Sequence, residues 1–263
     1  MSHLRAIFRL AALCLMTCAA YCVLAAGLAL ALPFHRARAR WRGFVLRRWA
    51  KAAASLLKIK VTSSGAAPRA PFFLVSNHLG YVDVIVLASR LDCAFIAKRE
   101  VASWPLIGML CRSVGTIFID RANRRSILQV NAEVERACRD GRGVVLFAEG
   151  TSTRGAGVLP FKPSLLEPAA RAGFAVSYAA ISYRTREAQS PAHLAVCWWG
   201  DMTFAGHLYG LLRLSEIRAT LAFGPSAIRD ADRKRLASRL REGVSREFIP
   251  VVTTEGQWNA ATL

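Results

Sequence analysis

A histidine and an aspartate stand five residues apart, at His78 and Asp83, directly after an apolar run that ends at Ser76. Gly80 allows a tight turn between them, and a stretch of helical character, Val84 to Ala88, follows the aspartate. This spacing can return the carboxylate to one imidazole nitrogen, which fixes the tautomer and leaves the other nitrogen to accept a proton. The pair therefore predicts a general base held in place by an acidic residue.

The sequence offers this base no nucleophile of its own, because no serine stands in a G-x-S-x-G turn. A base without a nucleophile is suited to activating a hydroxyl group of the substrate. A histidine beside a strand end is more often structural, so the spacing alone leaves that alternative open. A metal site is not expected, because no second histidine or cysteine cluster stands nearby in the sequence.

Two further stretches place polar residues just beyond an apolar run. One is G-T-I-F-I-D-R, from Gly115 to Arg121, and the other is F-A-E-G-T-S, from Phe147 to Ser152, with Arg154 and Lys162 shortly after it. Sites in open parallel sheets gather at the carboxyl ends of the strands. An arginine and a glycine-containing turn at such an edge suit a phosphorylated substrate, because guanidinium groups and turn amides bind phosphate oxygens.

Short apolar runs alternate with helical patterns from Ile59 onward. This alternation predicts an α/β fold with a largely parallel sheet flanked by helices, preceded by an N-terminal membrane-anchoring helix and an amphipathic interfacial helix. Helices are expected at Asn123–Asp140 and Asp232–Phe248, where apolar residues recur at helical spacing. The expected strands are Ile59–Thr62, Phe72–Ser76, Ala94–Ala97, Thr116–Ile119, Val144–Phe147, Ala175–Ile181, Leu194–Trp198 and Thr220–Phe223.

The segment from Leu10 to Phe34 holds 25 residues without a charged side chain or a histidine. A bilayer core needs about 20 apolar helical residues, whereas the apolar region of a cleaved signal peptide is about 7–15 residues long. A membrane anchor is therefore favoured over a signal peptide. The expected organisation is an anchor at 1–34, a basic amphipathic helix at 35–57, an α/β catalytic domain at 58–250 and a C-terminal tail at 251–263.

The amphipathic pattern runs from Trp41 to Leu57 and suits a helix in the membrane interface or, equally, a helix packed on the domain. The first 51 residues carry nine basic and no acidic residues, most of them after the apolar run. This asymmetry places the catalytic domain on the cytoplasmic side, at the inner membrane. Arginines near such a surface also attract anionic headgroups.

The chain has 263 residues, 36 of them basic and 17 acidic, which gives a formal charge of +19, and 54% of its residues are hydrophobic. This charge implies an anionic partner, and the apolar content favours membrane lipids. Nucleic acid is not expected as a partner, because no recognised module is present. The seven cysteines form no C-x-x-C pair, which favours a reducing compartment.

The chain resembles the glycerolipid acyltransferases, the lysophosphatidic acid acyltransferase group, over roughly Trp41 to Phe248. Asn77, His78 and Asp83 match the first motif of that family, N-H-x-x-x-x-D. The second motif, G-x-x-F-I-x-R, is complete from Gly115 to Arg121, and the third is present as Glu149-Gly150-Thr151-Ser152, with Ala148 in place of proline. The fourth falls at Ser177–Ile181, where Tyr178 replaces the usual proline.

The resemblance implies that His78 takes a proton from the acceptor hydroxyl and that Asp83 holds His78. Asn77, Lys98, Arg121, Glu149, Gly150 and Thr151 would bind substrate, with Arg121 on the acceptor phosphate. The thioester of acyl-CoA or acyl carrier protein would serve as co-substrate, with no bound cofactor or metal.

The lysolipid acceptor implied first is lysophosphatidic acid, with lyso-ornithine lipid as the alternative, since relatives acylate it and arginine also holds a carboxylate. A non-enzymatic binder of anionic membranes or nucleic acid and a lipid hydrolase remain as other classes. Acyl-chain preference and oligomeric state are unknown from the sequence.

Overall fold

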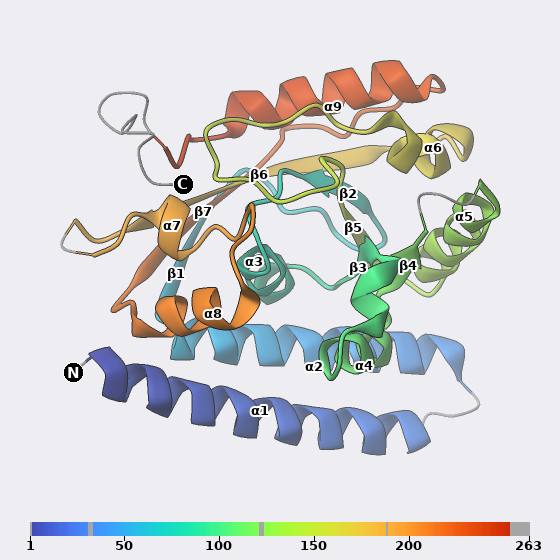
Figure 1. Cartoon of the computed structure of the whole chain (residues 1–263). Helices are drawn as coiled ribbons and strands as arrows, with labels where there is room; N and C mark the ends of the chain where they lie inside the picture. Colours follow the sequence, from blue (N-terminus) through green and yellow to red (C-terminus); the bar gives the residue numbers. More distant parts are fainter. Residues whose placement is uncertain (1, 31–33, 121–123, 188, 253–263) are drawn as a thin grey trace.

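A seven-stranded sheet forms the centre of the protein in the computed structural model (Figure 1). The structure describes residues 2–30, 34–120, 124–187 and 189–252, with only the backbone of residues 124–129 and 131. The strand order across the sheet is β1-β7-β6-β2-β5-β3-β4. The strands are β1 (Ile59–Ser64), β2 (Phe73–Ser76), β3 (Cys93–Lys98), β4 (Ile117–Ile119), β5 (Gly143–Phe147), β6 (Val176–Thr185) and β7 (Ile217–Phe223).

Every neighbouring pair in this sheet is parallel except β6 and β7. The prediction of a largely parallel sheet is therefore confirmed. The five strands β4, β3, β5, β2 and β6 all end at one edge, whereas β1 and β7 run the opposite way. All residues of the central strands β2 and β5 are buried, as expected of parallel strands that have both faces covered.

The helices form layers on both sides of the sheet (Figure 1). α6 and α9 pack together over one face, while α3 covers the other and is itself covered by α2. α1 lies against α2 and α8. The helices are α1 (Ser2–Leu30), α2 (His35–Leu56), α3 (Val82–Arg90), η1 (Arg99–Ser103), α4 (Ile107–Val114), α5 (Arg124–Arg139), α6 (Pro163–Arg171), α7 (Ala192–Ala195), α8 (Phe204–Arg213) and α9 (Arg233–Glu247).

One expected strand is wrong. Residues 194–198 form the end of α7 and a loop instead, because the chain turns at Pro191, whose carbonyl accepts the amide N–H groups of both Leu194 and Ala195. An apolar run of five residues does not distinguish a strand from a buried turn of helix. The other expected strands are present within a few residues, and α2 begins at His35, six residues before the apolar pattern that predicts it.

α1 is long and apolar enough to cross a membrane, by length and composition. It nevertheless packs sideways on the rest of the protein through polar contacts along its length. The Trp49 indole donates to Thr17 Oγ1 at 3.0 Å, and the Trp41 indole donates to the carbonyl of Leu24 at 3.2 Å. Its outward surface is apolar, with exposed side chains at Leu4, Ile7, Phe8, Leu15, Val23 and Leu30.

Near its N-terminus α1 is held by a buried arginine. The Arg9 guanidinium, 5% exposed, donates to the carbonyl oxygens of Leu212 and Leu214 at the end of α8. Carbonyls at a helix C-terminus have no partner within the helix, so a cationic donor placed there stabilises both groups.

We expect Arg9→Met to lower the free energy of unfolding by about 2 kcal/mol, because it keeps the apolar stem but leaves two carbonyls without their charged donor. Thermal unfolding in detergent micelles measures this loss. Arg5→Met is the matched control, since Arg5 is less buried and makes one bond, to the carbonyl of Arg213. Equal stability of the two variants would contradict the anchoring role of Arg9.

Candidate active site

The first motif lies in the middle of the edge where the parallel strands end. β2 pairs with β5 on one side and with β6 on the other, and its last residue, Ser76, stands level with Phe147 and Ala179. His78 follows two residues later. The register of the sheet therefore brings the residues that follow β2 and β5 beside the last part of β6, from Ala179 to Thr185, although more than 100 residues of chain separate that part of β6 from β2.

The expected contact between the histidine and the aspartate is present. His78 Nδ1 lies 2.8 Å from Asp83 Oδ2. Asp83 stands in the first turn of α3 and is fully buried, while the His78 side chain retains 23% of its exposure. A buried carboxylate on Nδ1 leaves Nε2 as the nitrogen that can exchange a proton with a substrate.

The Asp83 carboxylate is saturated with hydrogen-bond donors. Besides His78, Oδ2 accepts the backbone N–H groups of Leu79 at 2.7 Å and Gly80 at 3.0 Å. The other oxygen, Oδ1, accepts the hydroxyl of Tyr183 at 2.7 Å. These donors hold the carboxylate in one orientation and compensate the cost of burying its charge.

The His78 ring and backbone are fixed as well. The imidazole stacks on the Phe147 ring, with centroids 4.1 Å apart and planes 16° from parallel. The backbone N–H of His78 donates to Glu149 Oε1 at 2.8 Å, and its carbonyl accepts the N–H of Thr153 at 3.0 Å. The end of β5 and the segment after it therefore contact the ring, the backbone N–H and the carbonyl of His78. These contacts join the first motif to the third.

Glu149 links three segments of this edge. It is 2% exposed, and its second oxygen accepts the N–H of Leu159 at 3.0 Å. Burial raises the pKa of Glu149 to about 7, an effect that the two amide hydrogen bonds partly offset. Gly150 follows in a left-handed turn with φ of 75°, and Thr151 is exposed. The buried carboxyl group thus ties the loop to the end of β2.

Asn77 performs a similar connection to β6. Its side chain is 1% exposed, and the amide donates to the carbonyl of Ile181 at 2.9 Å and accepts the N–H of the same residue at 2.8 Å. Both contacts are with backbone, so the side chain continues the ladder between β2 and β6 after the strand has ended.

Of the two expected phosphate ligands, the structure describes Lys98. Lys98 is exposed at the end of β3, where it stands level with Ile119 of β4. Arg121 lies outside the described residues, two positions beyond Ile119 in the sequence. Arg99 and Asp120 form an exposed ion pair at 2.9 Å between these two strand ends.

Tyr183 is the member of this arrangement that the sequence did not single out. It lies on β6 beside other apolar residues, where a tyrosine is expected as a core residue. A cluster of aromatic side chains lies near His78 and consists of Tyr81, Trp104, Trp198 and Phe204. The backbone N–H of Trp198 donates to the carbonyl of Leu79, the residue after His78, at 2.8 Å. His207 Nδ1 forms a hydrogen bond with the Tyr81 hydroxyl at 2.9 Å.

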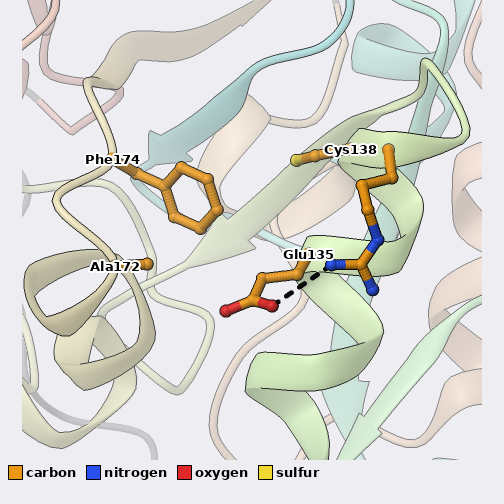
Figure 2. Close-up of a pocket in the computed structure, with 5 residues that line it drawn as sticks. Glu135, Cys138, Ala172 and Phe174 are labelled. Atoms are coloured by element: carbon orange, nitrogen blue, oxygen red, sulfur yellow. Dashed lines mark hydrogen bonds and ion pairs between the residues drawn. The ribbon is translucent and has the colours of Figure 1, made fainter.

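A surface cavity of about 400 Å³ lies elsewhere in the protein, between α5 and the segment after α6 (Figure 2). Glu135, Cys138 and Phe174 are among the residues that line it. Phe174 stacks on Phe73, the first residue of β2. This cavity is therefore at the opposite end of β2 from His78 and does not belong to the same site. Within the described part of the chain, no group of three His, Cys, Asp or Glu side chains is placed to hold a metal ion.

Comparison with known proteins points to one family. The family model described as Acyltransferase matches residues 58–182. The chain is 33% identical to a lyso-ornithine lipid O-acyltransferase from Brucella abortus over 223 residues, which cover 80% of this chain and 78% of that protein. It is 29% identical to a 1-acyl-sn-glycerol-3-phosphate acyltransferase from Neisseria gonorrhoeae over 196 residues, which cover 74% and 76% of the two chains.

A solved structure shares the fold. The crystal structure of the 1-acyl-sn-glycerophosphate acyltransferase PlsC from Thermotoga maritima matches with a TM-score of 0.61 and covers 94% of this chain and 97% of its own. The two sequences are 20% identical over this match. A likeness at that level supports the arrangement of elements and leaves the choice of substrate to other observations.

The raised pKa of Glu149 predicts a pH-dependent component of stability. The carboxyl group titrates near pH 7 in the folded protein and near its ordinary value of 4.5 when unfolded, so its protonated form favours folding. The contribution of this group to the free energy of unfolding is complete below pH 4.5 and declines by roughly 3 kcal/mol as the pH rises through 7. Glu149→Gln should remove this decline, as measured by urea unfolding between pH 4.5 and 8.

The control for this prediction is Glu135→Gln, because Glu135 is a partly exposed helix residue that pairs with Arg139. Its curve should keep the slope of the unmodified protein. A Glu149→Gln curve that also keeps this slope would show that Glu149 does not titrate in the predicted range.

Proposed function

Because this chain belongs to the acyltransferase family and is an acyltransferase, we propose that it is a membrane-bound lysolipid O-acyltransferase whose acceptor is lyso-ornithine lipid. The observation that carries the reaction type is the contact between His78 and Asp83 at the end of β2. The observation that favours the acceptor is the similarity to a lyso-ornithine lipid O-acyltransferase over 80% of the chain.

The geometry supports general-base catalysis by His78. Nε2 takes the proton of the acceptor hydroxyl while that oxygen attacks the carbonyl carbon of an acyl thioester. The carbon–sulfur bond then breaks, and the imidazolium returns the proton to the departing thiolate. The products are an ester and a free thiol. Asp83 stabilises the positive charge on the imidazolium between the two steps.

The acceptor proposed here differs from the one that the motifs first implied. Lysophosphatidic acid was favoured on the sequence because Arg121 and Lys98 suit a phosphate. The longer and closer match to a lyso-ornithine lipid enzyme now weighs more, since both cations can equally hold the carboxylate of an ornithine headgroup. Lysophosphatidic acid remains the second candidate, supported by the relative from Neisseria gonorrhoeae.

The proposal also covers the acyl donor and the attachment of the protein to the membrane. Acyl-CoA and acyl carrier protein both supply the required thioester. α1 packs lengthwise on α2 and α8 and presents its apolar surface outward, which supports attachment in the plane of the interface. The basic residues that follow α1 support an orientation with the catalytic domain on the cytoplasmic face of the inner membrane.

The deciding experiment is acyl transfer by purified protein in detergent, with labelled acyl-CoA or acyl carrier protein as donor and each lysolipid offered separately. We expect transfer to lyso-ornithine lipid. His78→Ala should lower the rate by about 10²–10⁴-fold, the usual contribution of a positioned base. His35→Ala is the control, because His35 is an exposed residue of α2.

Three other outcomes of this assay would each be informative. Transfer only to lysophosphatidic acid would keep the mechanism and replace the acceptor. Release of free fatty acid without any acceptor would indicate a hydrolase. Unchanged transfer by His78→Ala would remove the proposed base.

Asp83→Asn tests the charge on the orienting residue without removing its contacts. The asparagine oxygen can accept the donors now on Oδ2, and its amide can donate to the Tyr183 hydroxyl, so folding should be retained. The rate should still fall by roughly 10²-fold or more, because the imidazolium loses the negative charge that stabilises it. Steady-state kinetics and a melting curve measured together separate the two effects. Full activity in the variant would exclude a catalytic need for the charge.

A further inference from the structure

Tyr183 is a buried residue that is connected to His78 through Asp83. It is 1% exposed on β6, one hundred residues along the chain from Asp83, and its hydroxyl donates to Asp83 Oδ1 at 2.7 Å. The three donors on Oδ2 are the His78 ring and two backbone N–H groups of the same turn. Tyr183 is thus the donor to Asp83 that comes from another part of the fold.

The phenol is a neutral donor throughout the working pH range. Burial and the negative charge of Asp83 raise the pKa of Tyr183 well above its ordinary value of 10. Two other titratable groups stand near this pair. Cys197 is a buried thiol whose pKa is raised by burial, and Glu149 is the buried carboxyl group beside the His78 backbone. Neither is among the donors to Asp83 that the described residues provide, and Glu149 instead accepts the backbone N–H groups of His78 and Leu159.

We propose that Tyr183 is a positioning residue. Through its hydrogen bond to Asp83, it sets how tightly the His78 imidazolium keeps its proton. A hydrogen bond to Oδ1 draws negative charge away from Oδ2 and fixes the rotation of the carboxylate toward the imidazole. Without this bond, the charge on Oδ2 increases and the imidazolium keeps its proton more tightly. The inference rests on the proposed role of His78 as general base.

The alternative is that Tyr183 only fills the core. Its ring is buried and would stabilise the fold without any effect on His78. The two roles differ in one measurable respect. A packing residue changes stability and overall activity, whereas a residue that acts through Asp83 also changes the pH at which His78 loses its proton. That pH is reported by the acid limb of kcat/KM.

The experiment compares Tyr183→Phe with Tyr209→Phe, which removes a hydroxyl bonded to His3 on the exposed surface of α8. The pH profile of kcat/KM is recorded for each variant with the acceptor that the unmodified protein uses. For Tyr183→Phe we expect roughly a tenfold loss at neutral pH, the usual worth of a hydrogen bond to a charged group. Its acid limb should move to higher pH by roughly half a unit. The Tyr209→Phe limb should not move.

A second measurement covers the case in which Tyr183→Phe does not fold. 3-Fluorotyrosine introduced at position 183 keeps the hydroxyl and makes it a stronger donor, because fluorine increases the acidity of the phenol. It should move the acid limb to lower pH, opposite to the phenylalanine variant. In the Asp83→Asn background, Tyr183→Phe should add little further loss, since the group through which it acts has been changed.

The inference would be overturned if the acid limb of kcat/KM moved neither in Tyr183→Phe nor in the 3-fluorotyrosine protein. It would also be overturned if Tyr183→Phe lowered kcat/KM in the Asp83→Asn background by as much as it does in the unmodified protein. These failures are distinct from failure of the proposed function. If the unmodified protein transfers acyl groups with no acid limb, or if His78→Ala is fully active, it is the base itself that is wrong. If the unmodified protein shows an acid limb and Tyr183→Phe does not move it, only the role of Tyr183 is refuted.

Discussion

The buried carboxylate of Asp83 is the group on which the arrangement of the site depends. A fully buried negative charge is costly unless it is paired and hydrogen-bonded. Here four donors converge on it: the His78 ring and two backbone N–H groups of the turn after β2, and the Tyr183 hydroxyl of the neighbouring strand β6. Because the charge requires all of these donors, it also determines where the imidazole lies. The same contacts that compensate the buried charge of the carboxylate hold the imidazole in one orientation.

The parallel sheet makes this convergence possible. Strands that end at one edge leave their backbone groups and following loops close together, but the ladder stops there and the loops need other connections. Asn77 and Glu149 provide them, one bonding to the backbone of Ile181 and the other to the backbones of His78 and Leu159. Two residues of the recognised motifs thus act on the backbone of the site. Beyond them, Lys98 and Thr151 are exposed.

The sequence predicts the local parts of this structure better than the distant ones. The contact of His78 with Asp83 follows from a spacing of five residues and a glycine, and the parallel sheet follows from alternating patterns. The bond from Tyr183 crosses one hundred residues, so no local pattern reveals it, and a tyrosine among apolar strand residues indicates only burial. Residues 194–198 were assigned to a strand because a short apolar run fits either kind of element. The sideways packing of α1 depends on partners in α2 and α8 that its own composition does not indicate.

The two departures from the family motifs, Tyr178 and Ala148, are buried residues, and His78 and Asp83 are unchanged. Side chains alternate between the faces of a strand, so Tyr178 and Tyr183 of β6 point to opposite sides. Tyr183 reaches Asp83, whereas Tyr178 lies against Gly224 and against Gly243 of α9, on the far face. Ala148 is likewise buried, and its carbonyl accepts the N–H of Lys162. Neither replacement of proline therefore presents a new group to the acceptor.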